Sequence, residues 1–158
     1  MKKLVPPMVL CAAMLAGTTA HAQSFTYETD WQPVESIGGY TTPDGPEYQG
    51  GLVEGTYKTT YEDGSVDAGT VKCVGMDQPE GGVFEIHMTC NFGGESGTGT
   101  IVYGCTFQGP RGPGVPLSCI GAFEATSGEQ NGRRGNITMD WYTAEKASGT
   151  GQWFRSGG

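Results

Sequence analysis

The chain has 158 residues, of which 28 are glycine, and 17 acidic residues against 9 basic ones give it a formal net charge of −8. Such a balance argues against nucleic-acid binding, because phosphates require a concentrated basic face. The glycines follow no Gly-X-Y period, and aromatic and β-branched residues stand between them, which excludes collagen and indicates a turn-rich β protein.

Residues 1–22 are typical of a secretory signal peptide. Lys2 and Lys3 supply the positive start, an apolar run follows to Gly17, and Ala20-His21-Ala22 matches the small-x-small cleavage pattern. The apolar run is shorter than the roughly 20 residues that cross a bilayer. We therefore predict cleavage after Ala22, a periplasmic or secreted location and no membrane span. The remaining 136 residues have a net charge of −10 and suit one domain.

Two regions follow the signal peptide. Residues 23–50 are polar and interrupted by three prolines, so we predict a leading arm with one short strand at residues 25–27. Residues 51–158 alternate polar and apolar side chains between glycine-rich turns, which predicts a β-barrel domain. The strands expected there cover residues 55–62, 65–74, 83–90, 98–107, 117–125, 136–143 and 149–155.

The first predicted hairpin turns at Asp63-Gly64, one of the commonest sequences for a hairpin turn. Glu62, Asp63 and Asp67 crowd this turn, and carboxylates at such spacing can hold Ca²⁺, but the full EF-hand loop is missing. We interpret these residues as a solvated acidic hairpin tip.

Four cysteines remain after the signal peptide, which in an exported chain predicts two disulfides. Because there is no Cys-x-x-Cys pair and His87 is the single remaining histidine, we predict no metal site and no cofactor. A turn at Gly81-Gly82 would place Cys73 opposite Cys90, and a loop centred near Gly112 would place Cys105 opposite Cys119. These registers favour the pairs Cys73–Cys90 and Cys105–Cys119, although the sequence alone permits all three connectivities.

Seven or eight short strands without a convincing helix predict an all-β fold. A single antiparallel up-and-down β-barrel is the favoured architecture, because consecutive hairpins build it without long crossovers and glycine at strand bends permits tight curvature. A β-sandwich is the alternative.

The glycine-rich stretches resemble a known family of small barrels. These stretches are Gly97-Thr98-Gly99-Thr100, the run from Cys119 to Gly128, and Ser148-Gly149-Thr150-Gly151-Gln152-Trp153. They are similar to calycin-like exported bacterial proteins related to the allene oxide cyclase barrel. The resemblance implies an eight-stranded barrel with a central cavity, and it carries over no catalytic residue.

The first functional hypothesis is a binding module that holds a small, partly apolar ligand inside the barrel. The alternating faces of the predicted strands supply the candidate lining side chains, although a barrel of this size can also fill its interior with its own side chains. The candidates are Tyr57, Tyr61, Phe84, Ile86, Met88, Tyr103, Phe123, Met139 and Trp141.

Two other classes of function are also consistent with the sequence. One is a small isomerase or hydrolase in which His87 and a carboxylate, Glu85 or Glu124, form an acid–base pair. No nucleophile elbow, His-Glu-x-x-His motif or phosphate loop accompanies them. The other is a disulfide-stapled surface or interaction protein without a ligand cavity. The sequence leaves the oligomeric state undetermined.

Overall fold

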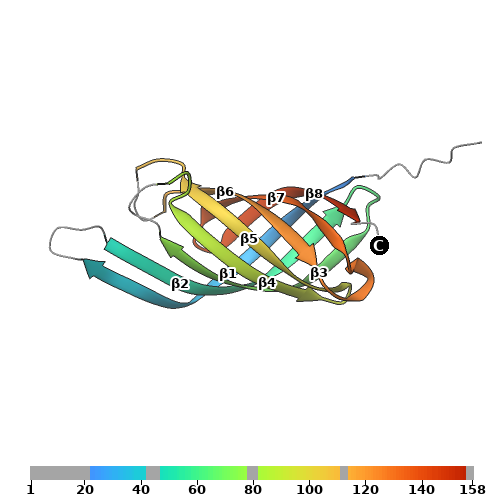
Figure 1. Ribbon diagram of the computed structural model, residues 1–158, viewed down its shortest axis with the longest axis horizontal. Coiled ribbons are helices and arrows are strands. Elements are labelled where there is room, and N and C mark those ends of the chain that lie inside the picture. The colour runs from blue at the N-terminus through green and yellow to red at the C-terminus, as the bar shows by residue number, and fades with distance from the viewer. Residues whose placement is uncertain (1–21, 42–46, 78–81, 111–113, 156–158) are drawn as a thin grey trace, which may run out of the picture.

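Eight antiparallel strands form a closed up-and-down barrel, as Figure 1 shows. The computed structural model describes residues 22–41, 47–77, 82–110 and 114–155. Each strand pairs with the next, and β8 pairs with β1 to close the sheet, which confirms the predicted barrel over the sandwich. The elements are β1 (Gln23–Thr41), β2 (Glu47–Tyr61), β3 (Val66–Asp77), β4 (Ile86–Gly94), β5 (Gly97–Phe107), β6 (Leu117–Ala125), the single-turn 3₁₀ helix η1 (Gly128–Gln130), β7 (Arg133–Thr143) and β8 (Lys146–Arg155).

The structure differs from the predicted leading arm. Residues 23–41 form β1, which pairs with β2 along its length and with β8 from Gln23 to Asp30. Phe25, Tyr27 and Trp31 point into the barrel and are almost fully buried. Pro33 does not prevent the strand, because it lies where β1 no longer pairs with β8 and where the β1–β2 register shifts. The predicted signal peptide lies outside the described residues, apart from Ala22.

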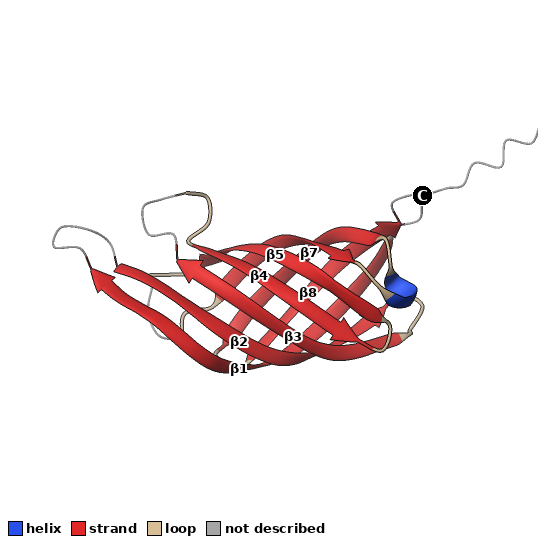
Figure 2. Ribbon diagram, turned by 60° about the horizontal axis from the view of Figure 1, so that its bottom comes forward, coloured by secondary structure: helices blue, strands red, loops and turns tan. Residues whose placement is uncertain are grey.

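The hairpin of β1 and β2 projects beyond one end of the barrel, at the left of Figures 1 and 2. Its pairing continues to Thr41 opposite Glu47, well past the last β1–β8 pair at Asp30 and Lys146. On the β8 side, residues 32–41 therefore have no partner strand within the described ranges.

Both disulfides lie inside the barrel. Cys73 on β3 is bonded to Cys90 on β4, and Cys105 on β5 is bonded to Cys119 on β6, with each pair in direct cross-strand register. These are the pairs that the hairpin registers predict. All four cysteines are at most 2% exposed, so the bridges also fill core volume.

Gly81 lies outside the described residues, so the structure does not describe the turn expected at Gly81-Gly82. Pairing of β3 with β4 ends at Asp77 opposite Ile86, and residues 78–81 lie outside the described part of the chain. Residues approaching β4 bond to β5 instead: the Glu85 amide donates to the Cys105 carbonyl. The predicted register is correct, because Cys73 pairs with Cys90 as expected.

Glycines on the inner face allow large rings to lie flat within a narrow barrel. Six inward aromatic residues stand directly opposite a glycine of the neighbouring strand, and a Cβ on that glycine would overlap or tightly crowd the ring. A Cβ on Gly121, for instance, would lie 2.8 Å from the Tyr103 ring, which fits a bulky neighbour at this glycine. The pairs are Phe25–Gly151, Tyr27–Gly149, Trp31–Gly55, Phe92–Gly99, Tyr103–Gly121 and Phe123–Gly135.

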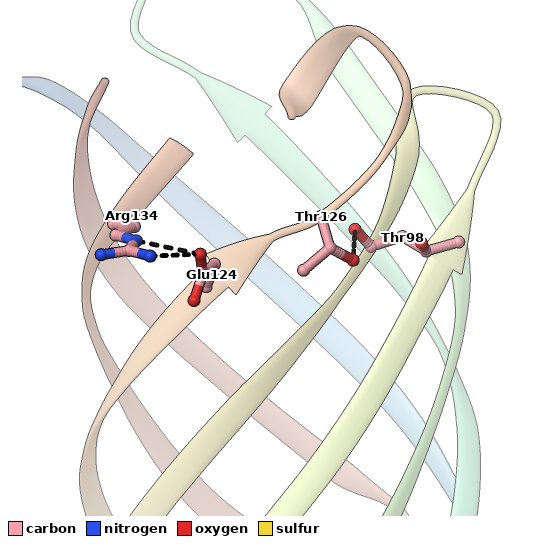
Figure 3. A network of polar contacts seen from close by, with 4 residues as sticks. All are labelled: Thr98, Glu124, Thr126 and Arg134. Carbon is pink, nitrogen blue, oxygen red and sulfur yellow. Dashed lines mark hydrogen bonds and ion pairs between the residues drawn. The ribbon is translucent and has the colours of Figure 1, made fainter. Parts of the chain in front are cut away.

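The segment between β6 and β7 is tied to the outer surface at the other end of the barrel. The Thr126 amide donates to the Thr98 carbonyl. The Thr126 hydroxyl donates to the same carbonyl, and Arg134 donates through Nε and Nη2 to Glu124 Oε1 (Figure 3). These contacts hold η1 beside the barrel end, which fixes the position of Gln130.

Candidate functional site

An internal cavity of about 70 Å³ lies within the barrel. Its wall is mostly aromatic and aliphatic, and its polar side chains come largely from the end of the barrel next to η1. The lining residues are Phe25, Tyr27, Thr29, Trp31, Tyr57, Thr59, Tyr61, Asp67, Val71, Cys90, Phe92, Ile101, Tyr103, Phe123, Gln130, Arg133, Ile137, Met139 and Trp153.

Asp67 is the centre of the polar end of the cavity. This carboxylate is only 6% exposed and points inward near the start of β3. Its Oδ2 accepts from the Tyr57 hydroxyl and the Gln130 amide, each at 3.1 Å, and its Oδ1 accepts from the Ser96 hydroxyl at 2.6 Å. Three donors thus compensate the cost of burying the charge.

Gln130 enters this cluster because η1 folds over the barrel end. Its backbone amide donates to the Ser96 carbonyl at 3.2 Å, while its side-chain amide reaches Tyr61 at 3.0 Å as well as Asp67. Gly128 permits the close approach: it has a φ of +67°, and a Cβ there would collide with the Ser96 backbone. These residues are far apart in the sequence: Asp67 lies in β3, Ser96 between β4 and β5, and Gln130 in η1.

Arg133, the first residue of β7, brings a cation to the same cavity. Its guanidinium carbon lies 3.9 Å from the centre of the Trp153 ring and 5.7 Å from that of Tyr61. Burial, followed by the charge of Asp67, raises the pKa of Tyr61, and the positive charge of Arg133 opposes that rise. The cavity end therefore holds one carboxylate and one guanidinium.

A second polar group crosses the interior farther along the barrel. The Tyr27 hydroxyl donates to the Thr138 carbonyl at 2.7 Å, and the Tyr103 hydroxyl lies 3.0 Å from Tyr27, where it can donate in turn. At the projecting-hairpin side, Trp31 stacks on Trp141 with ring centres 5.1 Å apart. These contacts pack the apolar part of the barrel interior.

The residues predicted to line the barrel interior fall into three groups. Tyr57, Tyr61, Tyr103, Phe123 and Met139 line the cavity. Ile86, Met88 and Trp141 belong to the packed interior but are not among the residues that line the cavity. Phe84 forms the third group by itself.

The prediction for Phe84 is wrong, because this residue lies on the outer face. It precedes β4, and its ring covers the outer side of Gly104, where a Cβ would overlap it. Strand alternation does not extend to a residue outside the strand.

The structure does not assemble the predicted acid–base pair. His87 is exposed on the outer surface and packs against Phe84, with ring centres 5.9 Å apart. Glu85 Oε2 accepts from the Phe107 amide at 2.8 Å, and Glu124 is bound to Arg134. All three groups lie away from the cavity lining, so they bring no histidine–carboxylate chemistry to the interior.

Sequence reasoning misses the most distinctive residues of the cavity. Asp67 is buried and does not belong to a solvated hairpin tip. It is separated from Val71 and Cys73 by even numbers of residues, so strand alternation could have placed its side chain on the inner face. Gln130 lies in η1, outside the strands, so strand alternation gives no signal for its position. Arg133 shares its parity with Ile137, which could have placed it on the inner face.

No family model, curated protein or solved structure matches this chain. Within the described residues, no three His, Cys, Asp or Glu side chains are grouped so that they could hold a metal ion. In the part of the chain that the structure describes, no helix is long and apolar enough to span a membrane.

Proposed function

We propose that this protein is an exported binding module that holds a small, partly apolar ligand inside its barrel. One observation carries the proposal: a cavity with aromatic walls inside the barrel has an ordered polar cluster at one end. Binding sites typically combine apolar walls with a few precisely placed polar groups. The candidate sites for acid–base chemistry lie outside that cavity, so binding is favoured over catalysis.

Cavity volume restricts the size of the ligand. The cavity of about 70 Å³ has room for about five non-hydrogen atoms, if each needs about the space of one water molecule. Drug-sized ligands occupy pockets of roughly 300 Å³ or more. At best about 1.5 kcal/mol per ligand atom is available, so the tightest dissociation constant is about micromolar. We expect a weakly bound compound with a short apolar part.

The two disulfides indicate an oxidising environment. Together with the signal-like residues 1–22, they support a periplasmic or secreted location for the mature protein. We also propose that the protein is related to the allene oxide cyclase-like barrels, and the closed eight-stranded barrel supports this relationship. We do not propose a cyclase activity.

The test is to fill the cavity. Val71 is a buried lining residue on β3, whereas Val74 on the same strand is 55% exposed on the outer surface. Binding of 1-propanol would be followed by NMR with the mature oxidised protein, together with Val71→Phe and the control Val74→Phe. We expect binding by the wild type and by Val74→Phe, and a loss of at least about tenfold in Val71→Phe.

Native mass spectrometry of protein purified from its own host provides the complementary measurement. A retained small mass that Val71→Phe lacks would support the proposal. If Val71→Phe does not fold, Val71→Ile adds one methylene at the same place. Equal binding of 1-propanol by the wild type and by a folded cavity-filled variant would refute an internal ligand site.

A specific observation also favours an interaction protein as a second candidate. The projecting hairpin leaves residues 32–41 of β1 without a β8-side partner strand among the described residues, and Val34 and Ile37 on it are 54% and 61% exposed. Open strand edges pair readily with other chains. Exchange of Val34 and Ile37 for lysine would abolish such an association in sedimentation experiments while leaving 1-propanol binding unchanged.

A further inference from the structure

Three buried hydrogen-bond donors on the cavity wall, on Trp31, Arg133 and Trp153, lack an acceptor among the described residues. Those of Arg133 and Trp153 belong to side chains that contact each other. Trp153 is 8% exposed, and its indole Nε1 has no hydrogen-bond partner within that part of the chain. The same is true of the buried Nε of Arg133, whose guanidinium lies against the Trp153 ring. Buried donors without an acceptor are costly, and such groups therefore point to a partner that supplies acceptor atoms.

The nearby carboxylate does not serve these donors. Asp67 already accepts three hydrogen bonds, from Tyr57, Ser96 and Gln130, and so uses three of about four acceptor positions. Its charge is thereby stabilised by neutral groups that are fixed in place. The surplus at this end of the cavity consists of donors, one of which belongs to a cation.

We propose that the ligand is a short-chain monocarboxylate whose carboxylate is anchored by Arg133 and Trp153. This inference rests on the proposed internal binding function and specifies its ligand class. A carboxylate has two acceptor oxygens and one negative charge, which match the donors on Trp153 and Arg133 and the positive charge of the Arg133 guanidinium. An alcohol or an amine does not, because an alcohol carries no charge and an ammonium group has no acceptor.

The remaining wall suits a hydrocarbon tail. Phe25 and Phe123 form an edge-to-face pair with ring centres 5.6 Å apart, and Ile137 lines the same cavity. With space for about five non-hydrogen atoms, propionate is the best-fitting probe of this class. Longer unbranched carboxylates should bind more weakly, because the wall must move to admit them.

Indole N–H signals provide a direct readout, because the chain has only three tryptophans. In ¹⁵N-labelled mature protein, propionate should shift the Trp153 indole resonance, which the Trp153→Phe variant assigns by its disappearance. The Trp141 resonance, from a ring outside the cavity lining, is the internal reference. Propionamide has the same number of non-hydrogen atoms without the charge, and we expect it to bind at least about tenfold more weakly.

A matched pair of arginine variants tests the anchor. Arg133→Gln should weaken propionate binding by about tenfold or more and leave propionamide nearly unchanged, whereas Arg134→Gln, on the exposed outer face, should affect neither. Trp153→Phe should weaken propionate as well. If Arg133→Gln does not fold, Arg133→Lys keeps a positive charge but removes Nε, and should still weaken binding.

The outcomes separate the two proposals. If propionate and propionamide bind equally, or Arg133→Gln binds propionate like the wild type, the carboxylate inference is wrong and the cavity-binding function stands. If 1-propanol binds but propionate leaves the Trp153 resonance unchanged, the inference is again overturned, and water meets these donors. If propionate, propionamide and 1-propanol all fail to bind, both proposals fail.

Discussion

Two buried tyrosines should make the barrel unstable at high pH. Tyr27 and Tyr103 are 7% and 5% exposed, with their hydroxyl oxygens 3.0 Å apart. Burial, and then repulsion from Tyr103, raises the pKa of Tyr27 far above its ordinary value near 10, and burial raises the pKa of Tyr103. In the unfolded chain both ionise near pH 10. Above that pH the folded state holds more protons than the unfolded state, so the free energy of unfolding falls.

Linkage gives the size of this effect. Each tyrosine that ionises only after unfolding lowers the free energy of unfolding by about 1.4 kcal/mol per pH unit above about pH 10. The pair therefore removes about 5 kcal/mol between about pH 10 and pH 12, which is comparable with the whole stability of many small domains. Below about pH 10 their contribution is fully present and constant.

The assay is urea unfolding at a series of pH values from about 8 to 12, combined with tyrosinate absorbance of the folded protein. The double variant Tyr27→Phe/Tyr103→Phe should lose the part of the alkaline slope that these two residues supply, about 2.7 kcal/mol per pH unit. Burial also raises the pKa values of Tyr57 and Tyr61, so these two residues should keep part of the slope. Tyr142→Phe, which changes an exposed side chain, should retain it. The reasoning is refuted if the double variant shows the wild-type slope, or if every tyrosine of the folded protein titrates near pH 10.

Two further predictions concern the interior of the barrel. Gly151→Ala should lower the free energy of unfolding by about 1–3 kcal/mol or prevent folding, because its Cβ would overlap the Phe25 ring. The control Gly93→Ala, whose Cβ would lie 3.5 Å from a Thr98 methyl, should change the free energy of unfolding by less than about 1 kcal/mol. Equal effects of the two substitutions in thermal melts would contradict the packing argument. Both disulfides are buried, so a reductant should reach them only when urea unfolds the barrel, and each bridge should contribute about 3 kcal/mol to the free energy of unfolding. Rapid reduction of the native protein by dithiothreitol, measured by mass spectrometry, would show that the bridges are not protected.

Alternation along single strands accounts for most of what could be predicted. The side-chain period of two is enough to assign Tyr103, Cys105, Cys119 and Phe123 to the inner face, and they lie there. Pairing of the cysteines follows from cross-strand register, which in a hairpin depends on where the loop is centred rather than on the conformation of the loop.

Prediction fails where the local pattern stops. Phe84 lies just outside β4, so alternation assigns it to the wrong face. The β1 segment has a broken pattern in the sequence because Pro33 and polar residues are tolerated on a projecting hairpin edge. Asp67 is assigned to solvent because carboxylates are seldom buried without partners, and its partners are distant in the sequence.

The sequence by itself determined the all-β character, the alternating faces, the turn at Asp63-Gly64 and the cysteine registers, because these depend on neighbouring residues or on one hairpin. Tertiary structure alone decided the polar end of the cavity. Asp67, Ser96, Gln130 and Arg133 come together there only when the sheet closes and η1 folds over its end. Closure is a property of all eight strands at once, so no local pattern records which side chains it brings into contact.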